Sequence, residues 1–258
     1  MNWQVKTRVW GRESIDSGWC IQGGQIDRIY YVHSGKINVE FNNKTMQLVP
    51  GYLYLIPQSV PFTAYVSDGD IVDHSFFDFV PIPCFLFQNV FQFAVTDYPL
   101  LQRWLNFAGE ICQTYVDRRW EPEVLDMVNS NIQSLLFVLS QITELPAMKD
   151  PRIQDTMLYI QNHLDEMLTV ESLASRLFLN KHYFTRLFTY NTGQSPHRYI
   201  QNQRMNLAVS LLKMGHSAKE TSEACGFGSY CAFARAFQST YGCPPTQYLQ
   251  NAKKQIFG

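Results

Sequence analysis

The sequence lacks a long apolar run, a strong excess of charge of either sign, and paired cysteines. No stretch approaches the roughly 20 apolar residues that cross a bilayer, so no membrane association is expected. No apolar segment follows Lys6 and Arg8 near the start, which argues against a signal peptide and predicts a cytoplasmic protein. The 258 residues are 46% hydrophobic and 17% charged, a composition typical of a globular chain with a sizeable core.

The cysteine and charge patterns narrow the choice further. The six cysteines form no C-x-x-C pair and have no histidine partners at zinc-binding spacing, so we expect reduced thiols rather than a disulfide framework. Residues 1–150 carry 10 basic and 16 acidic side chains, whereas residues 151–258 carry 11 basic and 6 acidic ones. The net charges of −6 and +5 suggest two domains, and the basic half suits a polyanionic partner.

The first half of the chain predicts a small β-structure followed by helices. Short apolar runs end at turn residues such as Ser34-Gly35 and Asn42-Asn43, and this spacing favours a sandwich or small barrel. Two helical stretches follow, within residues 100–112 and 125–142. The predicted strands are 29–32, 37–41, 46–49, 53–56, 62–66 and 72–80.

The second of these helices has a regular apolar seam. Leu125, Val128, Ile132, Leu135, Leu139 and Ile142 recur at alternating steps of three and four, the spacing of a seam between helices. Two interpretations stay open. The seam packs on the sheet of its own domain, or it packs on the same helix of a second subunit and makes a homodimer through residues 100–143. Pro146 to Pro151 then reads as a linker.

The last hundred residues contain an internal repeat, which is the most specific signal in the sequence. The shift is 49 residues after the turn and 48 before it, so the second copy has one extra residue in its turn. Phe184, Arg186, Phe188, Gly193, Pro196 and Tyr199 recur as Phe233, Arg235, Phe237, Gly242, Pro245 and Tyr248.

Each copy predicts a short helix, a tight turn and a second helix with a polar outer face, which is a helix-turn-helix. In the first copy Thr169 and Asn180 cap the two helices, and in the second copy Ser217 caps the first. Between the copies a long helix runs from Pro196 to about Lys213 and spans roughly 27 Å. Such a strut suits two recognition helices set about 34 Å apart, one turn of DNA.

Residues 151–250 resemble the DNA-binding domain of the AraC/XylS transcription regulators. The resemblance rests on the Gly226-Phe227 turn, the Phe233-x-Arg235-x-Phe237 pattern, and Tyr241-Gly242-x-x-Pro245-x-x-Tyr248. It implies that His182, Thr185 and Arg186 contact bases in one major groove and that Tyr230, Cys231 and Arg235 contact bases in the next. Lys181 and Ser229 would contact phosphates.

The second copy departs from the family pattern at three positions. Thr221 and Ser222 stand where family members usually have apolar residues, and Ala232 replaces an aromatic residue. We therefore expect the second unit to be less stable or less strict in the bases it selects. The alternative for the whole block, a helical bundle that binds no DNA, is disfavoured by the number of matched positions.

The strand-rich start has turn residues in Tyr31-Val32-His33-Ser34-Gly35, Val49-Pro50-Gly51 and Leu55-Ile56-Pro57. These fall where cupin-like domains have their turns, so this part resembles the cupin-like effector domain that precedes the module in many family members. His33 and His74 stand alone, without the H-x-H pair and carboxylate of metal-dependent cupins, so we expect neither a metal, a cofactor nor catalysis. A barrel lined with aromatic side chains can hold a small molecule, and the resemblance favours a sugar or similar metabolite. The candidates are Trp19, Tyr31, Phe62, His74 and Phe77. The alternative is that they form core, as aromatic residues that alternate along strands more often do.

We therefore predict an α+β protein of two domains. Residues 1–145 form a cupin-like β-barrel with following helices, residues 146–150 a linker, and residues 151–258 an all-α domain with two helix-turn-helix units. The predicted function is a transcription regulator, with activator as the expected mode, that binds promoter DNA, a small effector and RNA polymerase. Two alternatives remain: a cupin oxygenase or isomerase with an accessory DNA-binding tail, and a constitutive DNA-binding protein without an effector.

Overall fold

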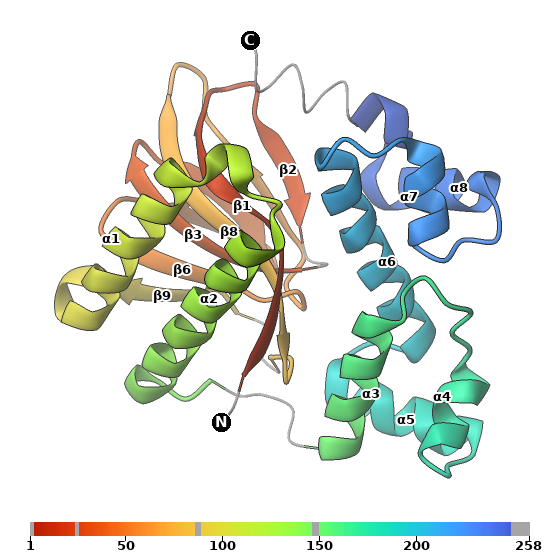
Figure 1. Ribbon diagram of the computed structural model, residues 1–258. Helices are drawn as coiled ribbons and strands as arrows, with labels where there is room; N and C mark the ends of the chain where they lie inside the picture. The colour runs from red at the N-terminus through yellow and green to blue at the C-terminus, as the bar shows by residue number, and fades with distance from the viewer. Residues whose placement is uncertain (1–2, 24–25, 86–88, 146–149, 249–258) are drawn as a thin grey trace. The chain divides into compact units, whose positions relative to one another are not determined.

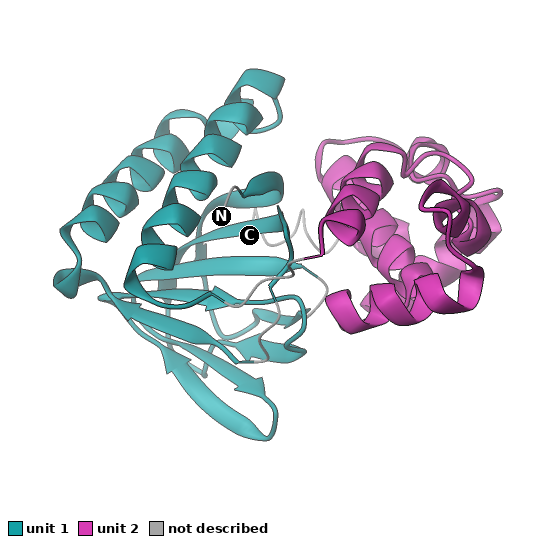
Figure 2. Ribbon diagram, turned by 90° about the horizontal axis from the view of Figure 1, so that it is seen from below, with its two compact units in different colours: residues 1–148 teal, residues 149–258 magenta. Residues whose placement is uncertain are grey.

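The computed structural model describes residues 3–23, 26–85, 89–145 and 150–248, and the chain divides into two compact units, residues 1–148 and 149–258 (Figure 2). Most of the expected linker, residues 146–149, lies outside the described residues. No helix in these ranges is long and apolar enough to cross a membrane.

Unit 1 is built on two antiparallel sheets, which agrees with the cupin-like class expected from the sequence. The larger sheet has the order β1-β8-β3-β6-β9 and the smaller one the order β2-β7-β4-β5. Their strands are β1 (Gln4–Ile15), β2 (Cys20–Gly23), β3 (Asp27–Ser34), β4 (Ile37–Phe41), β5 (Lys44–Leu48), β6 (Tyr52–Ile56), β7 (Phe62–Tyr65), β8 (Val72–Ile82) and β9 (Phe91–Ala94).

The helix layer of unit 1 covers one face of the larger sheet (Figure 1). It consists of α1 (Pro99–Thr114) and α2 (Pro122–Ile142), with the 3-10 turns η1 (Val95–Asp97) and η2 (Val116–Arg118) beside α1. Trp104 of α1 donates a hydrogen bond of 2.8 Å from Nε1 to the carbonyl of Asn131 in α2, which ties the two helices together.

The apolar seam of α2 lies inside this layer. Val128, Ile132, Leu135 and Leu139 are fully buried in the core that α1 and α2 share with the sheet. Of the two interpretations of the seam, packing within its own domain is therefore the one observed. Leu100, the first residue of the helical stretch expected from the sequence, is 58% exposed, and the buried stripe of α1 begins one residue later at Leu101.

Unit 2 contains six helices within its described residues, and each helix start is capped as its sequence suggests. Thr169, Asn180 and Ser217 accept hydrogen bonds from backbone N–H groups of the following turn, which confirms the three predicted caps. The helices are α3 (Pro151–Asn162), α4 (Val170–Arg176), α5 (Lys181–Thr192), α6 (Pro196–Lys213), α7 (Ala218–Ala224) and α8 (Tyr230–Tyr241).

The two copies of the repeat end their helices alike but differ in their turns. Gly193 and Gly242 close α5 and α8 with φ angles of 74°, in the left-handed region that glycine adopts without strain. In the turns, Gly226 of the second copy has φ 68°, and Phe178 adopts φ 55° at the matching position of the first. The first turn therefore carries a backbone strain that the second avoids.

Candidate nucleic-acid interface and ligand-binding region

The first helix-turn-helix is formed by α4 and α5 around a small aromatic core. Phe184 and Phe188 of α5 are fully buried, and Phe188 meets Tyr199 of α6 edge to face at 5.5 Å between ring centroids. Since these two inward residues are four apart, the opposite side of α5 is left to solvent. The outer face of α5 is therefore positioned by the core beneath it.

Of the four residues expected to contact DNA, His182 and Arg186 lie on that outer face, Thr185 lies at its edge, and Lys181 lies in the first turn of α5. Lys181, His182 and Arg186 are exposed, and Thr185 is partly buried; its hydroxyl donates a hydrogen bond of 2.8 Å to the carbonyl of Lys181. The Lys181 ammonium lies 2.6 Å from Glu171 of α4 and lowers the pKa of that carboxyl. A phosphate that approached Lys181 would have to compete with this exposed ion pair, which is weak in water.

The second helix-turn-helix, α7 and α8, repeats the arrangement. Phe233 and Phe237 are fully buried, while Ser229, Tyr230, Cys231 and Arg235 are exposed near the start of α8. Ser229 accepts a hydrogen bond of 3.2 Å from the backbone N–H of Ala232, and Arg235 donates 3.3 Å to the carbonyl of Cys231. The structure thus brings the second expected set together in the first half of the helix.

The departures from the family pattern in α7 lie in the core. Thr221 and Ser222 are 0% and 2% exposed, and the Thr221 hydroxyl has no hydrogen-bond partner among the described residues. A buried hydroxyl without a partner loses its hydration and gains nothing in return. This is the physical basis for expecting a weaker second unit.

Replacing Thr221 with valine should stabilise unit 2 by about 1 kcal/mol, because valine has the same shape and no hydroxyl to desolvate. Thermal unfolding followed by circular dichroism measures the change. Ser172→Ala, which removes half of the capping box of α4, is the control that should move the midpoint in the opposite direction. A midpoint that falls in the Thr221→Val variant contradicts the assignment of an unpaired hydroxyl.

In unit 1 the five residues expected to bind an effector do not come together. Trp19 and His74 are neighbours, with ring centroids 5.8 Å apart, whereas Phe77 stacks edge to face on Trp104 of α1. Tyr31 also packs against the core beneath the helices. Along β8 successive side chains point to opposite faces, so His74 and Phe77 cannot line one pocket. The expectation for Tyr31 and Phe77 is corrected to core.

The face of the larger sheet away from the helices carries a buried ion pair. Arg28 of β3 donates from Nη2 to Oδ2 of Asp78 at 2.5 Å and from Nη1 to the Tyr30 hydroxyl at 2.8 Å. The guanidinium carbon lies 6.0 Å from the ring centroid of Phe62. Burial, opposed only in part by the Arg28 charge, raises the pKa of Tyr30 to about 12, so its hydroxyl keeps its proton at neutral pH.

His74 lies beside this pair as a neutral ring. Burial and the Arg28 charge lower the pKa of His74 to about 4, and its Nδ1 atom has no hydrogen-bond partner among the described residues. His33 bonds instead to the Ser75 hydroxyl at 2.8 Å. Within the described ranges, no group of three or more histidine, cysteine or acidic side chains could hold a metal ion.

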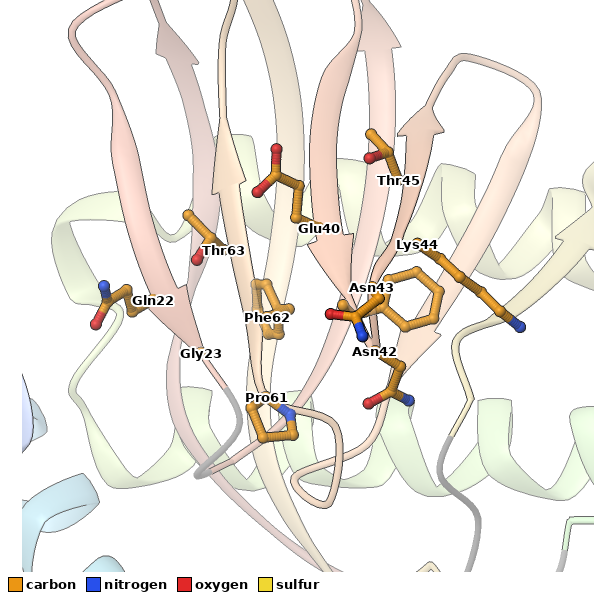
Figure 3. A pocket seen from close by; sticks show the side chains of 11 residues that line it. Gln22, Gly23, Glu40, Asn42, Asn43, Lys44, Thr45, Pro61, Phe62 and Thr63 are labelled. Atoms are coloured by element: carbon orange, nitrogen blue, oxygen red, sulfur yellow. The ribbon is translucent and has the colours of Figure 1, made fainter.

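A cavity of about 470 Å³ opens at the end of the smaller sheet, and Figure 3 shows its polar lining around the Phe62 ring. The ring can lie over Gly23 because glycine has no Cβ atom; a Cβ atom there would lie 2.1 Å from the Phe62 ring. Of the five expected effector residues, only Phe62 lines this cavity. The lining residues are Gln22, Gly23, Glu40, Phe41, Asn42, Asn43, Lys44, Thr45, Pro61, Phe62 and Thr63.

The sequence signal closest to this cavity is Asn42-Asn43, which predicted a turn and not a cavity. Asn42 and Asn43 have φ angles of 48° and 58°, as a two-residue hairpin loop between β4 and β5 requires. The pairing Phe41↔Lys44 then sets Lys44 level with Phe62, which pairs with Phe41 from the other side. Only the strand register brings Lys44 and Phe62 to the same end of the sheet.

Asp27 is a buried carboxyl whose titration should be visible in the stability of unit 1. It is 0% exposed, its Oδ1 accepts 3.2 Å from the backbone N–H of Gln58, and its Oδ2 has no partner among the described residues. Burial raises the pKa of Asp27 to about 8. The folded state therefore keeps a proton that the unfolded chain has already released, and stability falls as pH rises from about 4 to about 8.

Replacing Asp27 with asparagine should remove that slope, because the amide keeps the Oδ1 acceptor and carries no charge. We expect the Asp27→Asn variant to exceed the wild type in unfolding free energy by about 1–3 kcal/mol at pH 8, with little difference near pH 4. Urea unfolding across this pH range measures the difference. Equal slopes in the two proteins would mean that Asp27 is ionised in the folded state.

The chain is similar to known helix-turn-helix domains and transcription regulators. A family model described as a helix-turn-helix domain matches residues 173–251. The chain is 22% identical to the probable transcriptional regulator LumQ of Photobacterium leiognathi, over 95% of this chain and 98% of LumQ. It is also 22% identical to the Msm operon regulatory protein of Streptococcus mutans, over 96% of this chain and 93% of that protein.

Among solved structures, the chain resembles ToxT of Vibrio cholerae, with a TM-score of 0.66 over 96% of this chain and 97% of ToxT. The two sequences are 11% identical, so this likeness concerns the fold. It extends over both the strand-rich part and the helical part. A second ToxT structure, with a TM-score of 0.60 and 13% identity, is bound to an unsaturated fatty acid.

Proposed function

Since the chain belongs to the AraC/XylS family of DNA-binding transcription regulators, we propose that it binds a promoter by placing α5 and α8 in two successive major grooves on one face of the duplex. One observation carries the proposal: two helix-turn-helix units, each with capped helices and a buried phenylalanine pair in its second helix, are joined by a single helix, α6, of 18 residues. The alternative of an enzyme with a DNA-binding tail is rejected, because the relatives matched along their whole length are regulators.

Arg186 and Arg235 are the residues proposed to contact bases most directly. Each is exposed on the outer face of its second helix, and a guanidinium fits the paired acceptors of guanine. His182, Thr185, Tyr230 and Cys231 flank them at the groove-facing ends of the helices, and Lys181 and Ser229 lie where phosphates would pass. Because the two sets differ in sequence, the binding site should be non-palindromic.

The test is selection of duplexes from a random DNA library by the purified full chain. The proposal expects a site with two conserved boxes about one helical turn apart, and an affinity that falls steeply as salt rises. A selected site with a single short box would mean that only one unit contacts bases. No enrichment at low salt would contradict the proposed function itself.

We propose a polar, sugar-like effector for the cavity at the end of the smaller sheet. Its lining combines two phenylalanines, Phe41 and Phe62, with a carboxylate, an ammonium group and several amides, which suits hydroxyl groups better than an aliphatic chain. Among these groups Glu40 accepts 3.2 Å from the Tyr65 hydroxyl, which fixes its position. The fatty acid of ToxT offers the contrasting ligand class for a test.

Thermal shift of the full chain against sugars, sugar phosphates and a long-chain unsaturated fatty acid separates the two classes. A saturating sugar ligand should add about 2–4 kcal/mol of stability, and Glu40→Gln or Lys44→Met should remove the shift. Lys36→Met, a lysine of the same unit that pairs with Asp70 outside the cavity, is the matched control. A shift with the fatty acid alone would overturn the sugar assignment, and no shift would favour a constitutive regulator.

The outer faces of α1 and α2 carry exposed aromatic side chains. We propose a homodimer through the outer faces of α1 and α2, where Phe107 and Phe137 are 47% and 58% exposed. Sedimentation of a Phe137→Glu variant tests it, since a dimer through this face should become a monomer.

We also propose that the protein activates transcription in the cytoplasm through contact with RNA polymerase. Transcription in vitro from the selected site tests this, and the amount of transcript should increase when the protein is added.

A further inference from the structure

One side chain of α6 reaches both helix-turn-helix units. Arg204 donates from Nε to the carbonyl of Leu164 at 3.1 Å and from Nη2 to the carbonyl of Glu166 at 2.6 Å. Both carbonyls belong to the loop between α3 and α4, which leads into the first unit. The same guanidinium lies 5.7 Å from the ring centroid of Phe227, in the turn of the second unit.

The turn of the second unit is packed directly against that loop. Gly226 has φ 68°, and a Cβ atom at this position would lie 2.4 Å from the carbonyl oxygen of Leu164 and 2.8 Å from Nη2 of Arg204. No side chain other than glycine fits so close an approach. The loop, the Arg204 guanidinium and the Gly226 turn therefore form a three-part junction, which we call the Arg204 junction.

The remaining contacts of the junction make it stiff. Phe227 packs edge to face on Phe233, the core residue of α8, at 5.4 Å between centroids. A displacement of Phe227 would therefore be passed to the second recognition helix. Arg204 holds fixed backbone carbonyls rather than a mobile carboxylate side chain, and hydrogen bonds from a charged donor are roughly twice as strong as neutral ones.

The electrostatic setting fits a structural guanidinium rather than a free cation. Burial lowers the pKa of Arg204, although Cys225 and Asp165 act in the opposite direction. A half-buried charge of this kind is retained only where it makes specific bonds, since its desolvation must be compensated. Its bonds here link the two units, and it does not lie on either outer face expected to contact DNA.

We propose that Arg204 is a positioning residue that fixes the separation of α5 and α8, and thereby the spacing of the two DNA boxes that the protein accepts. The inference rests on the proposed two-box function and adds to it the source of spacing selectivity. Loss of the junction should leave the base contacts of each unit intact and let the two units adjust to a wrong spacing.

The experiment uses the full chain and the duplex that the wild type selects from a random library, together with duplexes carrying one base pair inserted or removed between the boxes. One base pair moves a box by about 3.4 Å and rotates it by about 35°. The wild type should lose roughly tenfold or more in affinity on either altered duplex, whereas Arg204→Met should lose about threefold or less, starting from a weaker affinity for the selected duplex.

Two further variants make the result specific to the junction. Arg204→Lys, which keeps a charged donor, should recover part of the spacing selectivity. Arg198→Met removes an exposed guanidinium from the same helix, six residues before Arg204, and should keep the wild-type spacing profile. Should Arg204→Met fail to fold, as judged by circular dichroism, Arg204→Gln serves in its place.

Each outcome bears on one of the two proposals. If the Arg204 variants keep the wild-type loss on both altered duplexes, the inference is overturned while the two-box function stands. If the wild type itself tolerates altered spacing, the two units are not held at a fixed separation and the inference is again wrong. A wild type that selects no two-box site removes the proposed function, and the inference falls with it.

Discussion

Replacing Asp78 with alanine should lower the free energy of unfolding of unit 1 by about 3–5 kcal/mol, because it leaves the Arg28 guanidinium buried without its counter-charge. The two side chains are 15% and 8% exposed, so water cannot replace the lost carboxylate efficiently. Tyr30 offers one remaining hydrogen bond at 2.8 Å, which satisfies only one of the five guanidinium donors.

A double substitution separates two quantities: the free energy lost when Arg28 is left without its partner, and the net contribution of the Arg28–Asp78 pair to stability. Arg28→Met combined with Asp78→Leu should recover most of the loss, since an apolar pair of similar volume carries no desolvation cost. Urea unfolding followed by tryptophan fluorescence measures all three proteins. Equal stability of the Asp78→Ala variant and the wild type would show that the pair is open to water.

The second large effect concerns DNA affinity. Arg186→Ala and Arg235→Ala should each cost about 1–3 kcal/mol in binding to the selected duplex, with relaxed base preference in one box each. Because the two residues lie on separate recognition helices, the losses should add to about 2–6 kcal/mol in the double variant. Competition binding with single-base variants of the selected duplex measures both affinity and preference.

The control removes the same charge elsewhere. Arg103 of α1 is exposed and lies in unit 1, so Arg103→Ala lowers the net charge equally without touching α5 or α8. Its affinity should stay within about twofold of the wild type, as expected for a surface charge away from the interface. If the Arg186 and Arg235 variants behaved like this control, the assigned outer faces would be wrong.

The helix-turn-helix part could be predicted closely because its determinants are local. A cap such as Asn180, an inward pair such as Phe184 and Phe188, and a closing glycine such as Gly193 each act within a few residues of chain. A repeat doubles every such signal. The same local signals did not reveal Arg204, because its partners are carbonyl groups, which any sequence supplies, and only folding brings Leu164 and Gly226 to it.

Unit 1 was predicted only in part, because the pairing register of its strands cannot be derived from local sequence signals. Six of its strands were expected, but β1, β2 and β9 were not, since the long strand β1 mixes Lys6, Arg8 and Arg12 with its buried residues. Its pairing along the whole of β8, from Gln4↔Ile82 to Ile15↔Val72, depends on the bulge after Thr7. A residue such as Phe77 changes from pocket to core with one step along the strand.

The measurement that tests the central claim most directly is a hydroxyl-radical footprint of the purified full chain on its selected duplex at two salt concentrations. The account predicts two protected patches on one face of the duplex, about one helical turn apart, both fading as salt rises. Protection of a single patch, or of two patches on opposite faces of the duplex, would contradict the simultaneous placement of α5 and α8 in successive major grooves.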